Sequence, residues 1–284
     1  MLLIHWAKLI KKMKILVFGG GLGNQIFGYA FTEYIRTRFP KQKVLGVYNQ
    51  SYLSEHYGLE VNKWFDVRLP ESRWYVSALT YLLYAIKKLT GWKRLLDLNQ
   101  NVMEKDNALV YFAQHTDKRY IPEGEWLHFK IDDNTLGGKN VALLREIRHS
   151  EAVFVHVRRG DYLSPKYIDR FKGCCTLDYY NLALHYVSEH VENPRYYVFS
   201  NDIEWTKKNL KINNPTYVDW NTDERSPIDM YLMSQCRYGI IANSTFSYWG
   251  AMLGDNKLIV TYPGKWINPP FSVGDIFPED WIKL

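Results

Sequence analysis

The residues best suited to chemistry lie in the run His156-Val-Arg158-Arg159-Gly-Asp161-Tyr162, which follows an apolar segment. Arginine suits a diphosphate, because its planar guanidinium forms two parallel hydrogen bonds to phosphate oxygens. Alternation along a strand places Arg158 on the same face as His156, with Arg159 and Asp161 on the opposite face. We therefore expect one arginine to face an anionic ligand and the other to pair structurally, with Asp161 as the candidate partner. The alternative is a solvated loop with a surface ion pair, which does not explain why a buried strand ends in adjacent arginines.

A glycine-rich run, GGGLGNQIF over residues 19–27, joins a predicted strand to a predicted helix. Such a turn brings backbone N–H groups close to a phosphate or a sugar, beside the positive end of the helix. The run does not match the dinucleotide-binding pattern, because Asn24 stands where the third glycine belongs and no acid for a ribose follows the next strand. The distinctive feature is the pair of amides Asn24 and Gln25 at the helix start. N-capping by Asn24 is the structural alternative.

A third run, Asn243-Ser-Thr-Phe-Ser247, connects a predicted strand to a further helix. Its hydroxyl and amide groups could hold phosphate oxygens at the helix start. The helix before that strand is predicted to begin at Ser226-Pro227, with the serine as N-cap and the proline in the first turn. Asp229 lies three residues after Ser226. It is either the acid of a capping box or a carboxylate that recognises a base.

Parallel strands alternating with helices are predicted to position these runs. The runs that predict strands are 14–19, 43–48, 108–112, 152–157, 195–200, 216–220, 238–242 and, as the last strand, 257–262. The predicted helices are 24–39, 76–90, 177–191, 203–210 and the two that begin at Ser226 and within 243–253. This order predicts an α/β fold of two facing, Rossmann-like, doubly wound parallel-sheet domains, with ligands at the carboxyl ends of the strands. We expect the domains to comprise residues 13–145 and 146–284.

Composition argues against several classes of protein. The 284 residues carry a net charge of +6, but the basic residues form short clusters rather than the stripe typical of a nucleic-acid-binding protein. Three cysteines without C-x-x-C spacing argue against a disulfide framework or a structural zinc site and favour a reducing compartment. The sequence has no apolar run of the ~18 residues that a membrane-spanning helix needs, and its N-terminus does not read as a signal peptide. The run MKILVFGG from Met13 looks like a natural start, so residues 1–12 are either an appended or misassigned start or, if native, a short basic amphipathic segment.

The three runs, in this order, resemble those of the bacterial α-1,2-fucosyltransferases of glycosyltransferase family 11 and, more loosely, those of the wider fucosyltransferase superfamily. The resemblance covers residues 14–262 and leaves 50–140 unmatched, which is where we expect acceptor specificity. It implies a GT-B fold, GDP-β-L-fucose as the donor, inversion at the anomeric carbon and no metal ion. The sequence contains no D-x-D, which agrees with a metal-independent enzyme in which arginine and a helix start neutralise the departing diphosphate.

The resemblance also implies roles for single residues. Arg158 matches the arginine that contacts the β-phosphate, and Asn24 matches the amino-terminal motif that faces the fucose, so these two are the expected catalytic residues. His156 and Asp229 match positions near the guanine, and Asp161 is expected to support the arginines. The expected donor-binding residues are Gly21, Gly23, Gln25, His156, Arg159, Asp161, Asp229, Ser244, Thr245, Phe246 and Ser247.

The resemblance assigns no general base. In the α-1,6 relatives a glutamate shortly after the arginine motif has this role, whereas here the segment 162–166 contains no acid. Either another carboxylate acts as the base, or the reaction is dissociative enough to need little help from one.

The expected reaction joins L-fucose to the 2-hydroxyl of a β-galactoside in a galactose-terminated oligosaccharide of a surface glycan, such as an O-antigen. Another linkage or acceptor is the nearest alternative. A nicotinamide-dependent oxidoreductase and a non-catalytic sugar-binding module are the alternatives of a different class. We expect a cytoplasmic protein. Residues 80–96 combine an apolar face with four basic residues, which fits either peripheral contact with the inner face of a bacterial membrane or a surface helix of the acceptor-side domain.

Overall fold

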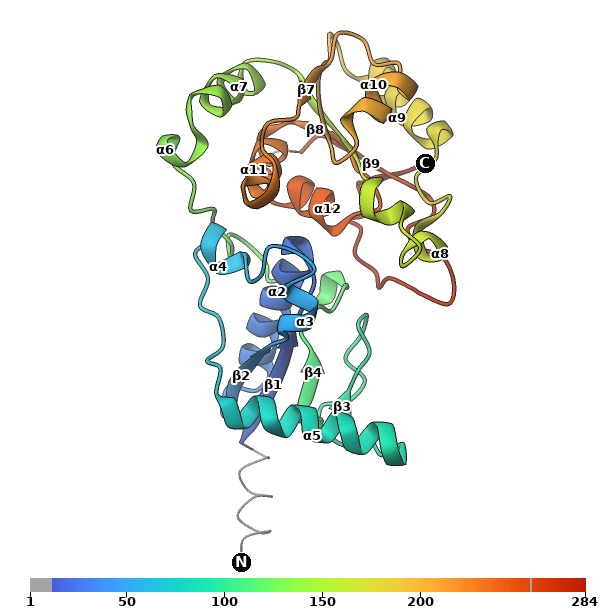
Figure 1. The fold of residues 1–284 in the computed structure, drawn as a ribbon. Helices are drawn as coiled ribbons and strands as arrows, with labels where there is room; N and C mark the ends of the chain where they lie inside the picture. The colour runs from blue at the N-terminus through green and yellow to red at the C-terminus, as the bar shows by residue number, and fades with distance from the viewer. Residues whose placement is uncertain (1–11, 256) are drawn as a thin grey trace, which may run out of the picture. The chain divides into compact units, whose positions relative to one another are not determined.

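The computed structural model describes residues 12–255 and 257–284, which form two compact units (Figure 1). The first unit contains the described residues up to His128 together with Val273–Ile276, and the second contains Phe129–Ser272 and Phe277–Leu284. Residues 1–11, most of the segment that is either an appended or misassigned start or a native amphipathic one, lie outside the described part of the chain. Within the described part, no helix is long and apolar enough to cross a membrane.

The boundary between the units follows residue 128, and not residue 145 as the sequence predicted. The helices α6 (Asp133–Leu136) and α7 (Gly138–Arg148) belong to the second unit because they bond to it. The Arg225 guanidinium donates to the backbone carbonyl at the end of α6, and the Asn140 side chain of α7 donates to Asn221 at 2.8 Å. These partners are 80 or more residues away in sequence, so local composition does not reveal the boundary.

The first unit is built on a four-stranded parallel sheet in the order β2-β1-β4-β3. Its strands are β1 (Met13–Phe18), β2 (Lys43–Tyr48), β3 (Leu96–Asp97) and β4 (Val110–Phe112), and its helices are α2 (Leu22–Arg38), α3 (Gln50–Leu53), α4 (Val61–Trp64), α5 (Trp74–Thr90) and the 3-10 helix η1 (Lys118–Tyr120). β2 has its predicted limits, and α5 begins two residues before its prediction. β3 was not predicted, because its two residues become a strand only by pairing with β4.

The second unit is built on a six-stranded parallel sheet in the order β10-β9-β8-β5-β6-β7. Its strands are β5 (Ala152–Val157), β6 (Arg195–Ser200), β7 (Thr216–Val218), β8 (Tyr238–Ile240), β9 (Ile259–Tyr262) and β10 (Ile282–Lys283). Besides α6 and α7, its helices are α8 (Ile168–Phe171), α9 (Leu177–His190), α10 (Ile203–Asn209), α11 (Pro227–Gln235), α12 (Thr245–Met252) and the 3-10 helices η2 (Gly160–Leu163) and η3 (Asp223–Arg225). The prediction that β9 is the last strand was wrong, because the short β10 pairs with it.

The strand order of the second unit reverses beside β5. β6 and β7 follow on one side of β5, whereas β8, β9 and β10 follow on the other. This is the doubly wound topology that the sequence predicted. Parallel sheets of this kind bind ligands at such a switch point, which here lies at the carboxyl ends of β5 and β8.

Two buried tyrosines at the start of α9 hold those strand ends in place. The Tyr179 hydroxyl lies 2.6 Å from the carbonyl oxygen of Ile241 and 3.1 Å from that of Thr261. The Tyr180 hydroxyl donates to the carbonyl of His156 at 3.1 Å. Desolvation raises the pKa of both phenols well above its usual value, so both stay protonated and act as donors. The carboxyl ends of β5, β8 and β9 are thereby tied to one helix.

Candidate functional site

His156 lies at the end of β5 and is almost completely buried. Its ring centroid is 5.8 Å from that of Phe246, so the strand end contacts the beginning of α12. Burial, together with the nearby Arg158 charge, lowers the pKa of His156 to about 3, and the imidazole is neutral at physiological pH. Its Nδ1 atom is buried and has no hydrogen-bond partner among the residues that the structure describes. Such a group is costly unless a ligand supplies the missing bond.

Arg158 is held in place by Asp161. Its Nη2 atom lies 2.9 Å and 3.0 Å from the two carboxylate oxygens of Asp161. The guanidinium carbon is 5.6 Å from the ring centroid of Tyr162, and the Nε–H is buried with no hydrogen-bond partner in the described part of the chain. A charged group fixed on one side and unsatisfied at Nε is suited to an incoming anion.

Arg159 points elsewhere, as strand alternation predicted, but its partner differs from the prediction. Its guanidinium lies 3.6 Å from the ring centroid of Trp205, and its Nε is 3.4 Å from the Asp202 carboxylate. Asp161 therefore supports Arg158 and not Arg159. Because these contacts occupy Arg159, the geometry argues against its expected contact with the donor.

In the loop before α12 and the first turn of that helix, some side chains form internal hydrogen bonds and others stay partly exposed. The Ser244 hydroxyl accepts the N–H of Phe246 at 3.3 Å and caps the helix. The Ser247 hydroxyl is completely buried, 3.3 Å from the backbone carbonyls of Ala242 and Ser244. The expected donor contacts of these two serine side chains are therefore not supported. Thr245 and Phe246 remain partly exposed at the positive end of α12, where an anion is favoured.

Tyr162 links the arginine run to the loop before α12, a role that sequence reasoning missed. Its hydroxyl donates to the backbone carbonyl of Asn243 at 3.1 Å, and its ring stacks on Phe171 with centroids 3.8 Å apart. The bond joins residues 81 positions apart, and the only sequence signal was the position of Tyr162 beside the arginines.

Replacing Tyr162 with phenylalanine should loosen this link without removing the stacked ring. We expect a stability loss of about 1 kcal/mol, typical of one neutral hydrogen bond, and a decrease in turnover smaller than about tenfold. Urea denaturation and steady-state kinetics measure the two effects. Tyr186→Phe is the matched control, because no hydroxyl partner of Tyr186 is found in the described part of the chain. Equal effects in both variants would contradict the linking role.

Asp229 lies in the first turn of α11, which packs beside α12. Its carboxylate accepts from Asn221 Nδ2 at 2.7 Å. Asn221 and Asn140 exchange hydrogen bonds of 2.8 Å and 3.0 Å, and Trp220 donates to Asn140 at 2.7 Å. Desolvation raises the pKa of Asp229 to about 8, so at neutral pH the ligand-free group is mostly protonated. The carboxylate form needs donors beyond Asn221.

The capping-box interpretation of Asp229 was wrong. Ser226 has helical backbone angles of φ −54° and ψ −29°, and its side chain forms no capping bond. The backbone N–H of Asp229 donates to the Ser226 carbonyl at 2.9 Å. The Asp229 side chain therefore forms no capping box and accepts from Asn221 of the amide cluster instead.

The glycine-rich run of the first unit starts α2. Gly21 is its extended N-cap with no side-chain bond, and Asn24 lies inside the first turn, so N-capping by Asn24 was wrong. Gly20 has a φ of +75°, and a Cβ atom there would lie 2.6 Å from Asn24 Nδ2. The His56 imidazole, which the sequence did not single out, lies against Gly21. Asn24, Gly21 and Gly23 thus form a tight helix start in which only glycine fits at residue 20.

Gln25 has a structural role and not the expected contact with the donor. Its side chain is completely buried. Its Nε2 donates to the carbonyls of Gly20 and Gly58 at 2.9 Å, and its Oε1 accepts the N–H groups of Glu60 and Val61 at 2.8 Å and 3.1 Å. This amide ties the glycine-rich turn to residues more than 30 positions away.

Gln25→Leu should therefore destabilise the protein without weakening nucleotide binding. Leucine fills a similar volume but leaves four backbone groups without partners, and we expect a loss of about 3 kcal/mol in the free energy of unfolding. The measurements are urea denaturation and GDP titration. Gln100 is exposed, so Gln100→Leu is the control and should change stability by less than about 0.5 kcal/mol. If Gln25→Leu kept wild-type stability but bound the donor more weakly, the structural role would be wrong and Gln25 would be a donor-binding residue after all.

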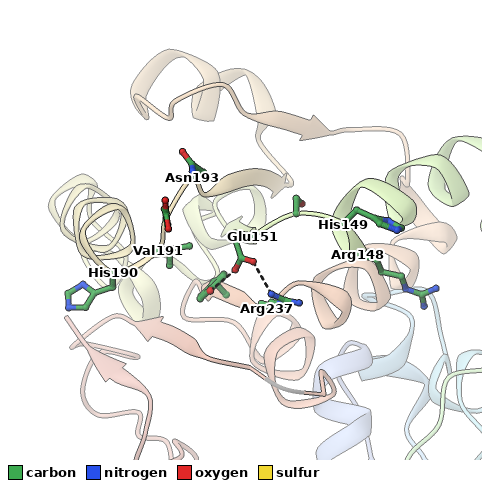
Figure 2. A pocket seen from close by; sticks show the side chains of 10 residues that line it. Arg148, His149, Glu151, His190, Val191, Asn193 and Arg237 are labelled. Atoms are coloured by element: carbon green, nitrogen blue, oxygen red, sulfur yellow. Dashed lines mark hydrogen bonds and ion pairs between the residues drawn. The ribbon is translucent and has the colours of Figure 1, made fainter.

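A polar hollow of about 770 Å³ lies at the amino ends of β5 and β8, the opposite edge from the residues above (Figure 2). Glu151 lines it, and its carboxylate lies 2.9 Å from the Arg237 guanidinium and 2.7 Å from the Tyr238 hydroxyl. It contains none of the expected site residues, and sheets of this type bind ligands at the other edge. Separately, no group of three or more His, Cys, Asp or Glu in residues 12–255 and 257–284 is arranged to hold a metal ion.

The fold and this strand-end site define a class of protein. Among solved structures, a glycosyl transferase family 9 protein from Veillonella parvula resembles the chain with a TM-score of 0.50, at 12% identity, over 96% of this chain and 87% of that one. Two units, each with a parallel sheet, and a cationic strand end beside a helix start are the features of a GT-B glycosyltransferase.

The sequence comparisons specify the family. The chain is 28% identical to the Escherichia coli alpha-1,2-colitosyltransferase, over 96% of this chain and 99% of that protein. It is 30% identical to the E. coli O-antigen biosynthesis glycosyltransferase WbnK, over 93% of this chain and 98% of that protein. A Sus scrofa galactoside alpha-(1,2)-fucosyltransferase 1 is 35% identical over 48% of this chain and 39% of its own length. The model of glycosyl transferase family 11 matches residues 5–284, and the chain belongs to that family.

Proposed function

We propose that this glycosyltransferase moves L-fucose from GDP-β-L-fucose to the 2-hydroxyl of a β-galactoside, with inversion at the anomeric carbon. The observation that carries the proposal is Arg158 at the sheet's switch point, fixed by Asp161 and with a buried Nε–H that none of the described residues satisfies. The partial similarity to a galactoside alpha-(1,2)-fucosyltransferase supports the linkage and the acceptor.

In the proposed step, the acceptor oxygen bonds to the anomeric carbon from the face opposite GDP. The bond from that carbon to the β-phosphate oxygen breaks, GDP leaves with its electron pair, and the hydroxyl proton passes to a base or to water. Negative charge grows on the leaving phosphate in an oxocarbenium-like transition state. Arg158 and the positive end of α12 stabilise that charge, and preorganised donors of this kind are usually the largest catalytic contribution.

The guanine end of the donor is assigned to the second unit. Nδ1 of the neutral His156 imidazole has no hydrogen-bond partner among the described residues, and a base edge can provide one. The desolvated Asp229 carboxyl accepts from Asn221 alone among the bonds described, and Phe246 offers a partly exposed ring beside His156. We assign the fucose contact to Asn24, supported by Gly21 and Gly23 in the same turn.

We place the enzyme in the cytoplasm, acting on a galactose-terminated oligosaccharide of a bacterial surface glycan. This rests on full-length similarity to an O-antigen biosynthesis glycosyltransferase. A colitosyl donor is the second candidate, because the full-length relative of 28% identity carries that name.

The deciding experiment measures GDP release from GDP-fucose, with and without lactose or N-acetyllactosamine, in EDTA. We expect release that the acceptor stimulates and EDTA does not change, and nuclear magnetic resonance of the product should show an α-1,2 linkage. GDP-colitose in a parallel reaction identifies the preferred donor. No release, together with no thermal stabilisation by GDP, would refute the proposal. NADH is expected to give no stabilisation.

A further inference from the structure

The helix α5 of the first unit has two different apolar faces. On one side Val76 and Leu83 are buried in a cluster with Ile15 and Leu45 of the sheet. Figure 1 shows α5 (Trp74–Thr90) running across that unit. The other side of α5 is exposed and is also apolar. A surface helix normally presents polar residues on the side away from the core.

The exposed apolar residues of α5 form one continuous line, which we call the outer stripe. Its members are Trp74, Ala78, Tyr81, Leu82, Ala85 and Leu89. Apart from the adjacent Tyr81 and Leu82, successive members are three or four residues apart, and at about 100° per residue all six lie on one face of a helix. The exposed fraction is 82% for Trp74, 56% for Leu82 and 84% for Leu89. Singly exposed leucines are normal, but a connected apolar stripe marks a docking surface.

The charge beside the outer stripe has one sign. Residues 74–96 contain no aspartate or glutamate, and their basic residues are Lys87, Lys88, Lys93 and Arg94. All four are exposed, and none pairs with a carboxylate in the part of the chain that the structure describes. Tyr75 and Trp92 are exposed as well and add two aromatic side chains next to the outer stripe in sequence. Cations that flank an apolar, aromatic stripe match the charge of an anionic lipid surface.

We propose that the outer stripe docks α5 on a membrane that contains anionic lipids. The stripe enters the boundary between headgroups and acyl chains, the tryptophans and tyrosines lie at the level of the headgroups, and the four cations pair with lipid phosphates. A second copy of this chain is disfavoured as the occupant, because it would bring two unpaired basic clusters together. This inference is independent of the proposed donor and acceptor.

The test uses the whole protein and co-sedimentation with vesicles of phosphatidylcholine, with or without about 30% phosphatidylglycerol. We expect binding to the anionic vesicles at least about tenfold tighter than to the neutral ones, and weaker binding at about 0.5 M salt. A Leu82→Glu/Leu89→Glu variant should bind at least about tenfold more weakly than wild type. Leu182, an exposed leucine of α9, provides the control Leu182→Glu, which should bind as wild type does.

An unchanged far-UV circular dichroism spectrum and urea midpoint verify that each variant is folded, because thermal stabilisation by GDP reports only on the other unit, which contains the assigned nucleotide site. Absence of wild-type binding to anionic vesicles would overturn the proposal. So would equal binding by the Leu82→Glu/Leu89→Glu variant. The third measurement is sedimentation equilibrium without lipid. If the wild type and Leu182→Glu are dimers and only the Leu82→Glu/Leu89→Glu variant is a monomer, the stripe is an interface with a second copy instead.

Discussion

Arg158→Ala is expected to lower turnover by about 10²–10³-fold, the range for loss of one preorganised donor to a developing anion. Within residues 12–255 and 257–284, the ion pair of Arg158 is with Asp161, three residues away, so the substitution leaves no distant carboxylate unpaired. The thermal midpoint should therefore stay close to that of wild type. Acceptor-dependent GDP release under saturating donor measures the change.

Arg159→Ala is the matched control for this prediction. Its guanidinium lies on Trp205 and near Asp202, so its loss should affect stability more than turnover. Arg158→Lys tests geometry at constant charge, because an ammonium cannot reproduce the guanidinium fork, and it should also be strongly impaired. If Arg158→Ala kept more than about a tenth of wild-type turnover, a loss well below the expected range, the assignment of Arg158 would be wrong.

Asp229→Asn is expected to weaken GDP-fucose binding by about 10–100-fold, the range for hydrogen bonds to a charged group. A carboxylate can accept from both the ring N–H and the exocyclic amine of guanine, whereas an amide presents one acceptor and one unsuitable donor. Isothermal titration with GDP and with IDP, which lacks that amine, gives a sharper readout. Wild type should prefer GDP, and the variant should bind the two nucleotides almost equally.

The same carboxyl should make donor binding depend on pH. Its pKa is raised to about 8 in the ligand-free protein, and guanine recognition needs the ionised form. Affinity for GDP-fucose should therefore rise by about tenfold per pH unit between pH 5 and 7, and level off above pH 8. The pKa of His156 is lowered to about 3, so His156 does not titrate in this range. The Asp229→Asn variant should show a flat profile.

The control for both experiments is Asp178→Asn, an exposed acid in the first turn of α9, which should leave affinity and pH profile unchanged. A sloped profile in Asp229→Asn would assign the titration to another group. Without ligand, the raised pKa of Asp229 means that its carboxyl destabilises the fold progressively as pH rises from about 4 to 8. The Asn variant should lack this decline.

Much of the fold could be predicted because its signals are local. β2, β5 and β6 have the predicted limits, since buried parallel strands are continuous apolar runs bounded by turns. The strands that were missed, β3 and β10, have two residues each. Pairing with a neighbour, and not local composition, makes such short segments strands.

For the candidate site, the sequence predicted the directions of the side chains only as far as strand β5 continues. Alternation correctly placed Arg159 away from Arg158, but it paired Asp161 with the wrong arginine. The reason is that the chain leaves the strand at Arg158 and turns into the 3-10 helix η2 (Gly160–Leu163), where the period of two no longer applies. Asp161 thereby turns back toward Arg158.

The sequence by itself determined which residue types stand at the carboxyl ends of buried strands, and through them the family. Only the tertiary structure decided which of those polar groups remain available. Gln25 and Ser247 were candidates by type and position, yet backbone partners occupy both. The hydrogen bonds of Tyr162 and Asp229 are with the carbonyl of Asn243 and the side chain of Asn221, respectively, which are distant or non-adjacent in sequence. Apolar periodicity acts over a few residues, whereas hydrogen-bond partners and desolvation come from segments that meet only in the folded chain.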